Sequence, residues 1–186
     1  MSADNKKSIQ LRLTVYASLF AALTAAGAYL SIPIGPVPIV LQNMFVFLAG
    51  LLLGSRWGLA SIGLYLLAGA CGLPVFAGGL GGIGRILGPT GGYLIGYLPC
   101  VYCVGKIAEN AQQKTYADIM AMICGSIIIY GFGVAWLKIL TAMTLSKTLA
   151  VGLYPFIIGD ALKIAAAAAI ARALRPAIKI NGNIAH

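Results

Sequence analysis

Long apolar runs, separated by short polar or glycine- and proline-rich segments, make up most of this chain. A helix needs about 20 apolar residues to cross the hydrocarbon of a bilayer, and about 17 to 25 are tolerated. The pattern predicts six such helices, at residues 13–30, 39–53, 57–73, 92–107, 119–140 and 153–174. The predicted fold is an all-α integral membrane protein, with residues 1–186 forming a single transmembrane domain.

Two connecting segments carry almost no charge. Residues 31–38 hold three prolines, which exclude a continuous helix and favour an extended connector. Residues 74–92 are rich in glycine, carry only Arg85 as a charge, and are expected to be the longest non-helical stretch. A flexible linker is the alternative for this second segment. Because non-helical backbone at membrane depth needs protein or a cavity to satisfy it, we expect both segments to close over a ligand.

The composition is that of a protein in lipid rather than water. The chain is 60% hydrophobic and 9% charged, with a mean hydropathy of +0.94. A water-soluble domain has about 25% charged residues and cannot bury so large an apolar fraction. The net charge is +9, but no Lys or Arg run is longer than two residues, so nucleic acid is excluded as a partner.

The positions of the basic residues predict the orientation of the helices. With six spans both termini lie on one side, and that side carries nine of the 13 Lys and Arg residues. Since cytoplasmic loops are enriched in Lys and Arg, both termini are expected to be cytoplasmic. The nine are Lys6, Lys7, Arg12, Arg56, Lys106, Lys114, Arg172, Arg175 and Lys179. Among the acidic residues, only Asp160 lies elsewhere.

Asp160 and Lys163 lie inside the last predicted span and share one face of it. A charge there costs about 2.5 to 3.5 kcal/mol, so a functional site is expected, with a structural ion pair as the alternative. The predicted outer ends of other helices add Gln42, Asn43, Arg85 and Tyr93 at the same level. Such a set suits a small, mostly apolar ligand with a polar ring and an anionic end. A helix cap or an interfacial anchor would explain some of these residues singly.

Small residues form a stripe on the first predicted helix. Ala17, Ala21 and Ala25 recur at every fourth position, and Ala22 and Ala26 lie on the adjacent stripe. Small side chains let another helix approach closely in a membrane. The spacing leaves open whether that helix belongs to this chain or to a partner.

No motif indicates catalysis, a metal or a cofactor. Cys100 and Cys103 form a C-x-x-C pair without a nearby His or acidic residue, which we interpret as helix packing. The chain has no phosphate-binding loop, no H-E-x-x-H and no G-x-S-x-G. We therefore expect no enzymatic activity and no hydrolysis of ATP by this chain.

Five features follow one another along nearly the whole chain. They are the Ala-rich first helix, the turn at 34–38 before Gln42 and Asn43, the turn at 53–58, the loop ending at 88–93, and the segment 159–163. In this order they resemble the BioY family, the substrate-binding S components of energy-coupling factor (ECF) biotin transporters.

The resemblance implies the ECF S-component fold and biotin bound near the outer face of the cell membrane. It also implies assembly with a transmembrane T component, which would contact the stripe of Ala17, Ala21 and Ala25, and with two ATP-hydrolysing subunits. On this basis Asp160 is expected to accept hydrogen bonds from the ureido N–H groups, while Lys163 is expected either to reach the ureido oxygen or to balance the charge of Asp160. Arg85 is expected to pair with the carboxylate, helped by Gln42, Asn43 or Tyr93. An S component for riboflavin or thiamine, a membrane-embedded enzyme and an assembly scaffold remain alternatives.

Overall fold

Helices form nearly all of the computed structural model, which describes residues 3–33, 35–111 and 114–178. The long helices are α1 (Ala3–Tyr29), α2 (Gln42–Ala70), α4 (Gly91–Asn110), α5 (Thr115–Thr141) and α7 (Tyr154–Ile178). The short elements are β1 (Ser31–Ile32), β2 (Ile39–Val40), α3 (Ile83–Ile86) and α6 (Leu145–Gly152).

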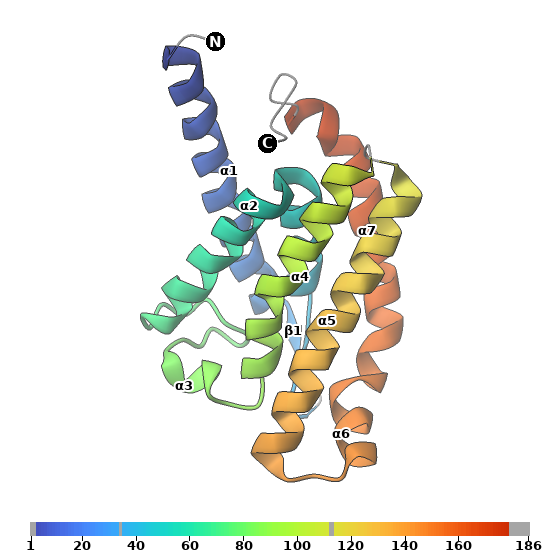
Figure 1. Cartoon of the computed structure of the whole chain (residues 1–186). Helices are drawn as coiled ribbons and strands as arrows, with labels where there is room; N and C mark the ends of the chain where they lie inside the picture. Colours follow the sequence, from blue (N-terminus) through green and yellow to red (C-terminus); the bar gives the residue numbers. More distant parts are fainter. Residues whose placement is uncertain (1–2, 34, 112–113, 179–186) are drawn as a thin grey trace.

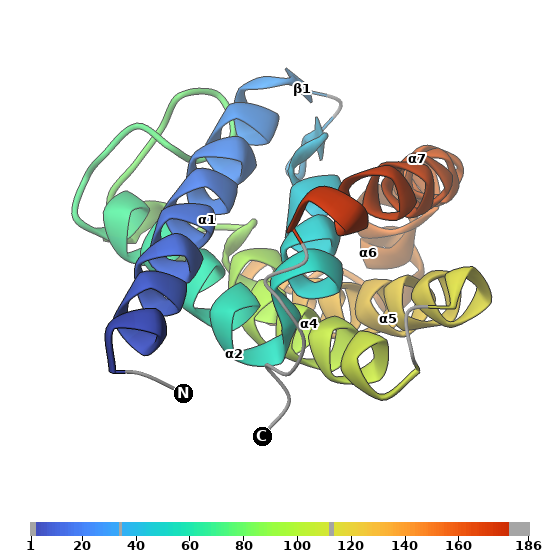
Figure 2. The same ribbon diagram turned by 90° about the horizontal axis from the view of Figure 1, so that it is seen from above.

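The helices form a bundle in which α4 lies between α2 and α5. Helix α1 packs along the other side of α2, and α7 packs against both α2 and α5 (Figure 2). Both ends of the described chain lie at one end of the bundle, whereas α3, α6 and the β1–β2 hairpin lie at the opposite end (Figure 1). We call the latter the loop end.

Four helices of the described chain are long and apolar enough to cross a membrane. They are Lys7–Tyr29, Gln42–Ala70, Thr115–Thr141 and Leu145–Pro176. Helix α4, which contains Pro99, matches the predicted fourth span but is not one of these four. The prediction of a mostly helical membrane protein is therefore confirmed.

The second and third predicted spans are the two helical halves of the element labelled α2, which meet at Gly54. The first half runs away from the loop end and the second half runs back towards it (Figure 1), so that Gln42 and Tyr65 lie within hydrogen-bond distance of each other. Gly54 has φ 77° and ψ −175°, a backbone conformation that residues with a side chain rarely adopt. The chain reverses its direction at this residue, in agreement with the turn predicted at 53–58. The second and third predicted spans are therefore confirmed as two helices, although a single residue separates them.

The connectors at the loop end were predicted with mixed success. The proline-rich segment is extended, as expected, and forms a hairpin in which Ser31 pairs with Val40 and Ile32 with Ile39. The glycine-rich segment is not entirely non-helical, since it contains the single turn of α3. The prediction also missed α6, which occupies much of the connection between the last two spans.

An ion pair ties α5 to α7 near the end of the bundle where the termini lie. The guanidinium nitrogens Nη1 and Nη2 of Arg175 each donate to one carboxylate oxygen of Asp118, both at 2.7 Å. Asp118 is only 1% exposed. A planar guanidinium and a carboxylate in this bidentate arrangement fix both distance and orientation, so the two helices are held firmly at this point.

Candidate functional site

A cavity of about 630 Å³, counting the space that opens to solvent, lies at the loop end of the bundle. Its walls come from the hairpin, the glycine-rich segment and helices α2, α4, α5 and α7. The lining residues are Val37, Pro38, Val40, Gln42, Asn43, Phe76, Ala77, Arg85, Thr90, Tyr93, Leu94, Tyr97, Tyr130, Phe156 and Lys163.

The β1–β2 hairpin places the first residues of α2 in the cavity wall. The Leu41 amide donates to the carbonyls of Gly27 and Leu30, which anchors the start of α2 to the end of α1. Gln42 follows directly, and its Nε2 donates to the hydroxyl of Tyr65 at 2.8 Å. The turn chemistry of the proline-rich segment thereby fixes the position of Gln42 and of Asn43 beside it.

Asp160 is the centre of a buried polar cluster. Its Oδ1 accepts a hydrogen bond from Lys163 Nζ at 2.7 Å, and its Oδ2 accepts from the Tyr130 hydroxyl and, at 3.5 Å, from Asn43 Nδ2. Asp160 is 4% exposed and Lys163 7%. A buried ion pair is stable only when further hydrogen bonds satisfy its remaining atoms, and Tyr130 and Asn43 supply them here.

Two tyrosines of α4 complete this end of the cavity. The Tyr97 hydroxyl donates to Asn43 Oδ1 at 2.7 Å, and the Tyr93 hydroxyl donates to the Gly152 carbonyl of α6 at 2.8 Å. The ring of Tyr93 packs against α5 at Gly133, where an added Cβ would overlap the ring. Glycine is therefore required at this crossing, and Tyr93 lines the cavity with its ring while its hydroxyl holds α6.

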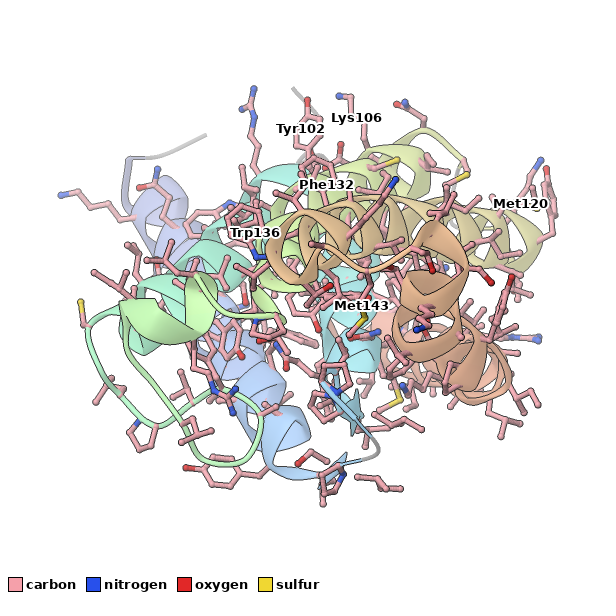
Figure 3. All side chains as sticks on the ribbon, turned by 90° about the horizontal axis from the view of Figure 1, so that it is seen from below. Tyr102, Lys106, Met120, Phe132, Trp136 and Met143 are labelled. Atoms are coloured by element: carbon pink, nitrogen blue, oxygen red, sulfur yellow. The ribbon has the colours of Figure 1, made fainter. Side chains whose placement is uncertain are left out.

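Arg85 is the cation of the cavity that lacks an acidic partner among the described residues. Glu109, Asp118 and Asp160 are the acidic side chains described, and each already pairs with another Lys or Arg. Two hydrogen bonds hold the segment that carries Arg85. Trp136, labelled in Figure 3, donates from Nε1 to the Gly88 carbonyl at 3.0 Å, and the Tyr29 hydroxyl donates to the Pro74 carbonyl. Arg85 is thus available to an anionic ligand.

The predicted polar set converges as expected, with one difference. Gln42, Asn43, Arg85, Tyr93 and Lys163 line the cavity. Asp160 is not a lining residue, and both its oxygens accept hydrogen bonds from the protein. A carboxylate has about four acceptor positions, of which three are occupied here, so the direct contact with a ligand expected from the sequence depends on access to Asp160 from the cavity.

Sequence reasoning missed Tyr97 and Tyr130, which both line the cavity. A signal existed for Tyr97, since it follows Tyr93 by one helical turn and so lies on the same face of α4. The chain around Tyr130 is a run of apolar residues, and nothing in its spacing singles the tyrosine out. Its role becomes visible only when α5 and α7 are seen side by side.

The stripe predicted as a partner surface lies mostly inside this chain. Ala17 is 5% exposed and Ala21 7%, both in the hydrophobic core, and Ala25 is half-buried against it. The reason is that α1 uses this face to pack on α2. The exposed small residues of α1 are one position further along, on the adjacent stripe of Ser18, Ala22 and Ala26.

Comparison with known proteins gives one consistent result. Residues 3–180 match the model of the BioY family. The biotin transporter BioY of Thermotoga maritima is 40% identical over 166 residues, covering 89% of this chain and 96% of that protein. The biotin transporter BioY of Lactococcus lactis subsp. cremoris is 36% identical over 170 residues, covering 88% of this chain and 89% of that protein.

A solved structure is similar over nearly the whole chain. It is the crystal structure of the S component for biotin from an ECF-type ABC transporter, with a TM-score of 0.85, 33% identity and 95% of both chains covered. The chain therefore has the fold of an ECF S component and is a multi-pass membrane protein. Its relatives are transporters, in agreement with the expectation that it is not an enzyme. The chain belongs to the BioY family.

Proposed function

We propose that this chain is the biotin-binding S component of an ECF transporter, and that it captures biotin at the outer face of the cytoplasmic membrane. Uptake is driven by ATP hydrolysis in two partner subunits, coupled to this chain through a transmembrane T component. The names of the relatives and of the similar solved structure support both the ligand and the ECF assembly.

The observation that carries the proposal is the chemistry of the two polar regions of the cavity. Lys163 is neutralised by Asp160, whereas Arg85 faces the cavity without an acidic partner among the described side chains. Biotin has an uncharged cyclic urea at one end and a carboxylate at the other. The urea suits the cluster around Asp160, the carboxylate suits Arg85, and Phe76, Leu94 and Phe156 offer apolar contacts to the rest.

The proposal changes the expected role of Asp160. We assign it the task of orienting Lys163, Tyr130 and Asn43, which line the cavity, rather than that of a ligand contact. The proposed orientation has both termini in the cytoplasm, because most basic residues lie at the end of the bundle where the termini are found. The loop end and its cavity then face outward.

Equilibrium binding to the purified chain tests the proposed ligand. Biotin should bind saturably with one site per chain, while riboflavin and thiamine should not compete with it. Co-expression with a T component and two ATP-hydrolysing subunits should then confer uptake of labelled biotin that stops when the ATPases are inactivated. Saturable binding of another vitamin in preference to biotin would refute the assignment.

A further inference from the structure

We propose that the polar end of the cavity recognises a cyclic urea by a fixed pattern of hydrogen-bond donors and acceptors. In this pattern Tyr130 is an acceptor that determines specificity, and Tyr97 is a positioning residue. Asn43 and Lys163 offer only N–H donors in this pattern, and Tyr130 offers only an oxygen. The proposal rests on the function proposed above and adds to it which ligand atoms are accepted, and why.

The pattern begins with Asp160, because an ionised carboxylate accepts hydrogen bonds and cannot donate them. Asp160 forms an ion pair with Lys163 at 2.7 Å, and the Tyr130 hydroxyl and Asn43 Nδ2 donate to its other oxygen. Every group that faces Asp160 must therefore direct a proton towards it. This requirement determines the state of Tyr130 and the orientation of the Asn43 amide.

Asn43 is held from two sides. Its Nδ2 must face Asp160, so its Oδ1 faces the other way, where the Tyr97 hydroxyl donates to it at 2.7 Å. A carbonyl oxygen has no proton, so Tyr97 can only be the donor in this pair. With Oδ1 and one N–H engaged, Asn43 presents its second N–H to the cavity. Tyr97 thus acts through Asn43, because its hydroxyl donates to the Oδ1 atom that could otherwise accept a hydrogen bond from the ligand.

Tyr130 has the opposite character. It has one hydroxyl proton, which it donates to Asp160, and it also lines the cavity. What remains for a ligand is the lone-pair electrons of its oxygen, which accept a hydrogen bond. Lys163 next to it has only donors, and one of these already points to Asp160. The cavity therefore presents donors from Asn43 and Lys163 beside an acceptor from Tyr130.

This arrangement is complementary to the edge of a cyclic urea. A urea carries an oxygen acceptor flanked by two N–H donors, so its oxygen meets Asn43 and Lys163 while one N–H meets Tyr130. A ligand with N–H groups in place of the oxygen leaves two protein donors facing donors. A ligand without the N–H leaves the Tyr130 oxygen facing another acceptor. Unpaired buried polar groups are costly, so both changes should be rejected.

Three kinds of ligand and four proteins test the pattern by equilibrium binding. The ligands are biotin, 2-iminobiotin, in which a protonated imine replaces the ureido oxygen, and the two cyclic carbamate analogues, in which one N–H group is replaced by oxygen. The proteins are the unmodified chain, Tyr130→Phe, Tyr97→Phe and the control Tyr102→Phe. Tyr102 loses the same hydroxyl from a residue that is about half exposed and points away from the bundle (Figure 3).

The unmodified chain should prefer biotin by about tenfold or more over 2-iminobiotin and over one of the carbamates. Tyr130→Phe should remove most of the preference over that carbamate, because the acceptor that reads the N–H is gone. Tyr97→Phe should narrow the preference over 2-iminobiotin, because Asn43 Oδ1 becomes free to accept from it. Tyr102→Phe should change neither ratio.

The ratios separate this pattern from a merely structural role, in which a variant would weaken biotin and its analogues equally. Equal weakening by Tyr130→Phe and Tyr97→Phe would overturn the proposal. If the variants fail to fold, binding to the unmodified chain still tests the proposal. Equal affinity of the unmodified chain for biotin and for both kinds of analogue would also overturn the proposed pattern. Absence of biotin binding to the unmodified chain would refute the proposed function itself.

Discussion

Two cations of the cavity differ in whether their charge is already balanced. Lys163 pairs with Asp160 at 2.7 Å inside the bundle, whereas Arg85 lines the cavity and has no acidic partner in the described chain. A balanced cation in an apolar interior donates hydrogen bonds without a net attraction for anions. An unbalanced cation also attracts charge. The two residues should therefore respond differently when the charge of the ligand is removed.

Replacing Arg85 by Ala should weaken biotin binding by about tenfold, since a charged hydrogen bond contributes about 1.5 to 3 kcal/mol and the partial exposure of Arg85 to water favours the low end. Biotin methyl ester, which has no negative charge, should bind Arg85→Ala and the unmodified chain almost equally. Lys147→Ala removes an exposed cation of α6 at the same end of the bundle and should leave both affinities unchanged. Equal losses for biotin and its ester in Arg85→Ala would contradict this assignment.

The polar residues of the site could be predicted where their chemistry is rare in a membrane, and not elsewhere. Asp160 and Lys163 stand out because charge is expensive in hydrocarbon, and the structure pairs them at 2.7 Å, as the alternative of an ion pair had it. Tyr130 does not stand out, because tyrosine is common in membrane helices as an interfacial or packing residue. Nor could the sequence show that protein donors occupy both oxygens of Asp160, which depends on how three helices pack.

Gly54 lets the chain reverse its direction within α2, so that this element consists of two helices. After the break at Gly54, the Ser55 amide has no carbonyl one turn earlier to donate to, and Glu109 of α4 replaces it. Glu109 Oε1 accepts from the Ser55 amide at 2.7 Å and from its hydroxyl at 3.0 Å. Gly105 permits this approach, since a Cβ there would collide with the Ser55 nitrogen.

Glu109→Ala should lower the free energy of unfolding by about 1 to 2 kcal/mol, because it leaves the start of the second helical part of α2 without its cap. Denaturation in detergent would measure the loss. Lys106→Ala is the matched control, since it removes only an exposed ion pair at 3.8 Å and keeps the Glu109 carboxylate in place. A loss as large in Lys106→Ala would show that the ion pair, rather than the cap, provides the stability.

The helices and connectors could be predicted where the length of an apolar run determines whether a helix spans the membrane. The proline-rich connector and the helical character of all six predicted spans agree with the structure. The division between the second and third spans was predictable, because Gly54, Ser55 and Arg56 interrupt the apolar run and the structure turns at Gly54. Helices α3 and α6 were missed because they are too short to be recognised by membrane-spanning length.

At the scale of the whole molecule, α1 has two stripes of small residues with different surroundings. Ala17 and Ala21 pack in the core, whereas Ser18, Ala22 and Ala26 are exposed. Adjacent positions on a helix are about 100° apart, so the two stripes lie on different faces of α1. Because both stripes consist of small residues, the sequence does not show which of them faces outward. We therefore propose the stripe of Ser18, Ala22 and Ala26, rather than the predicted one, as the surface for the T component.

Ala22→Trp should leave folding and biotin binding of the isolated chain intact, because lipid can accommodate the added ring, but should prevent assembly with the T component. Co-purification with the partner subunits measures the effect. Ala21→Trp, one residue away, should instead overfill the contact between α1 and α2 and damage folding and binding. Normal assembly by Ala22→Trp would place the interface elsewhere.

The ties between α5 and α7 bear on how long a ligand stays bound. Asp118 and Arg175 clamp the two helices near one end, and Tyr130 and Asp160 link them beside the cavity. With both attachments intact, α5 and α7 are held together, so we expect a ligand to leave past the hairpin and the glycine-rich segment, which also line the cavity. The residence time of biotin should then depend on these two segments. Lengthening the hairpin should speed biotin release in a stopped-flow experiment, because the contacts of the ligand with α5 and α7 are unchanged.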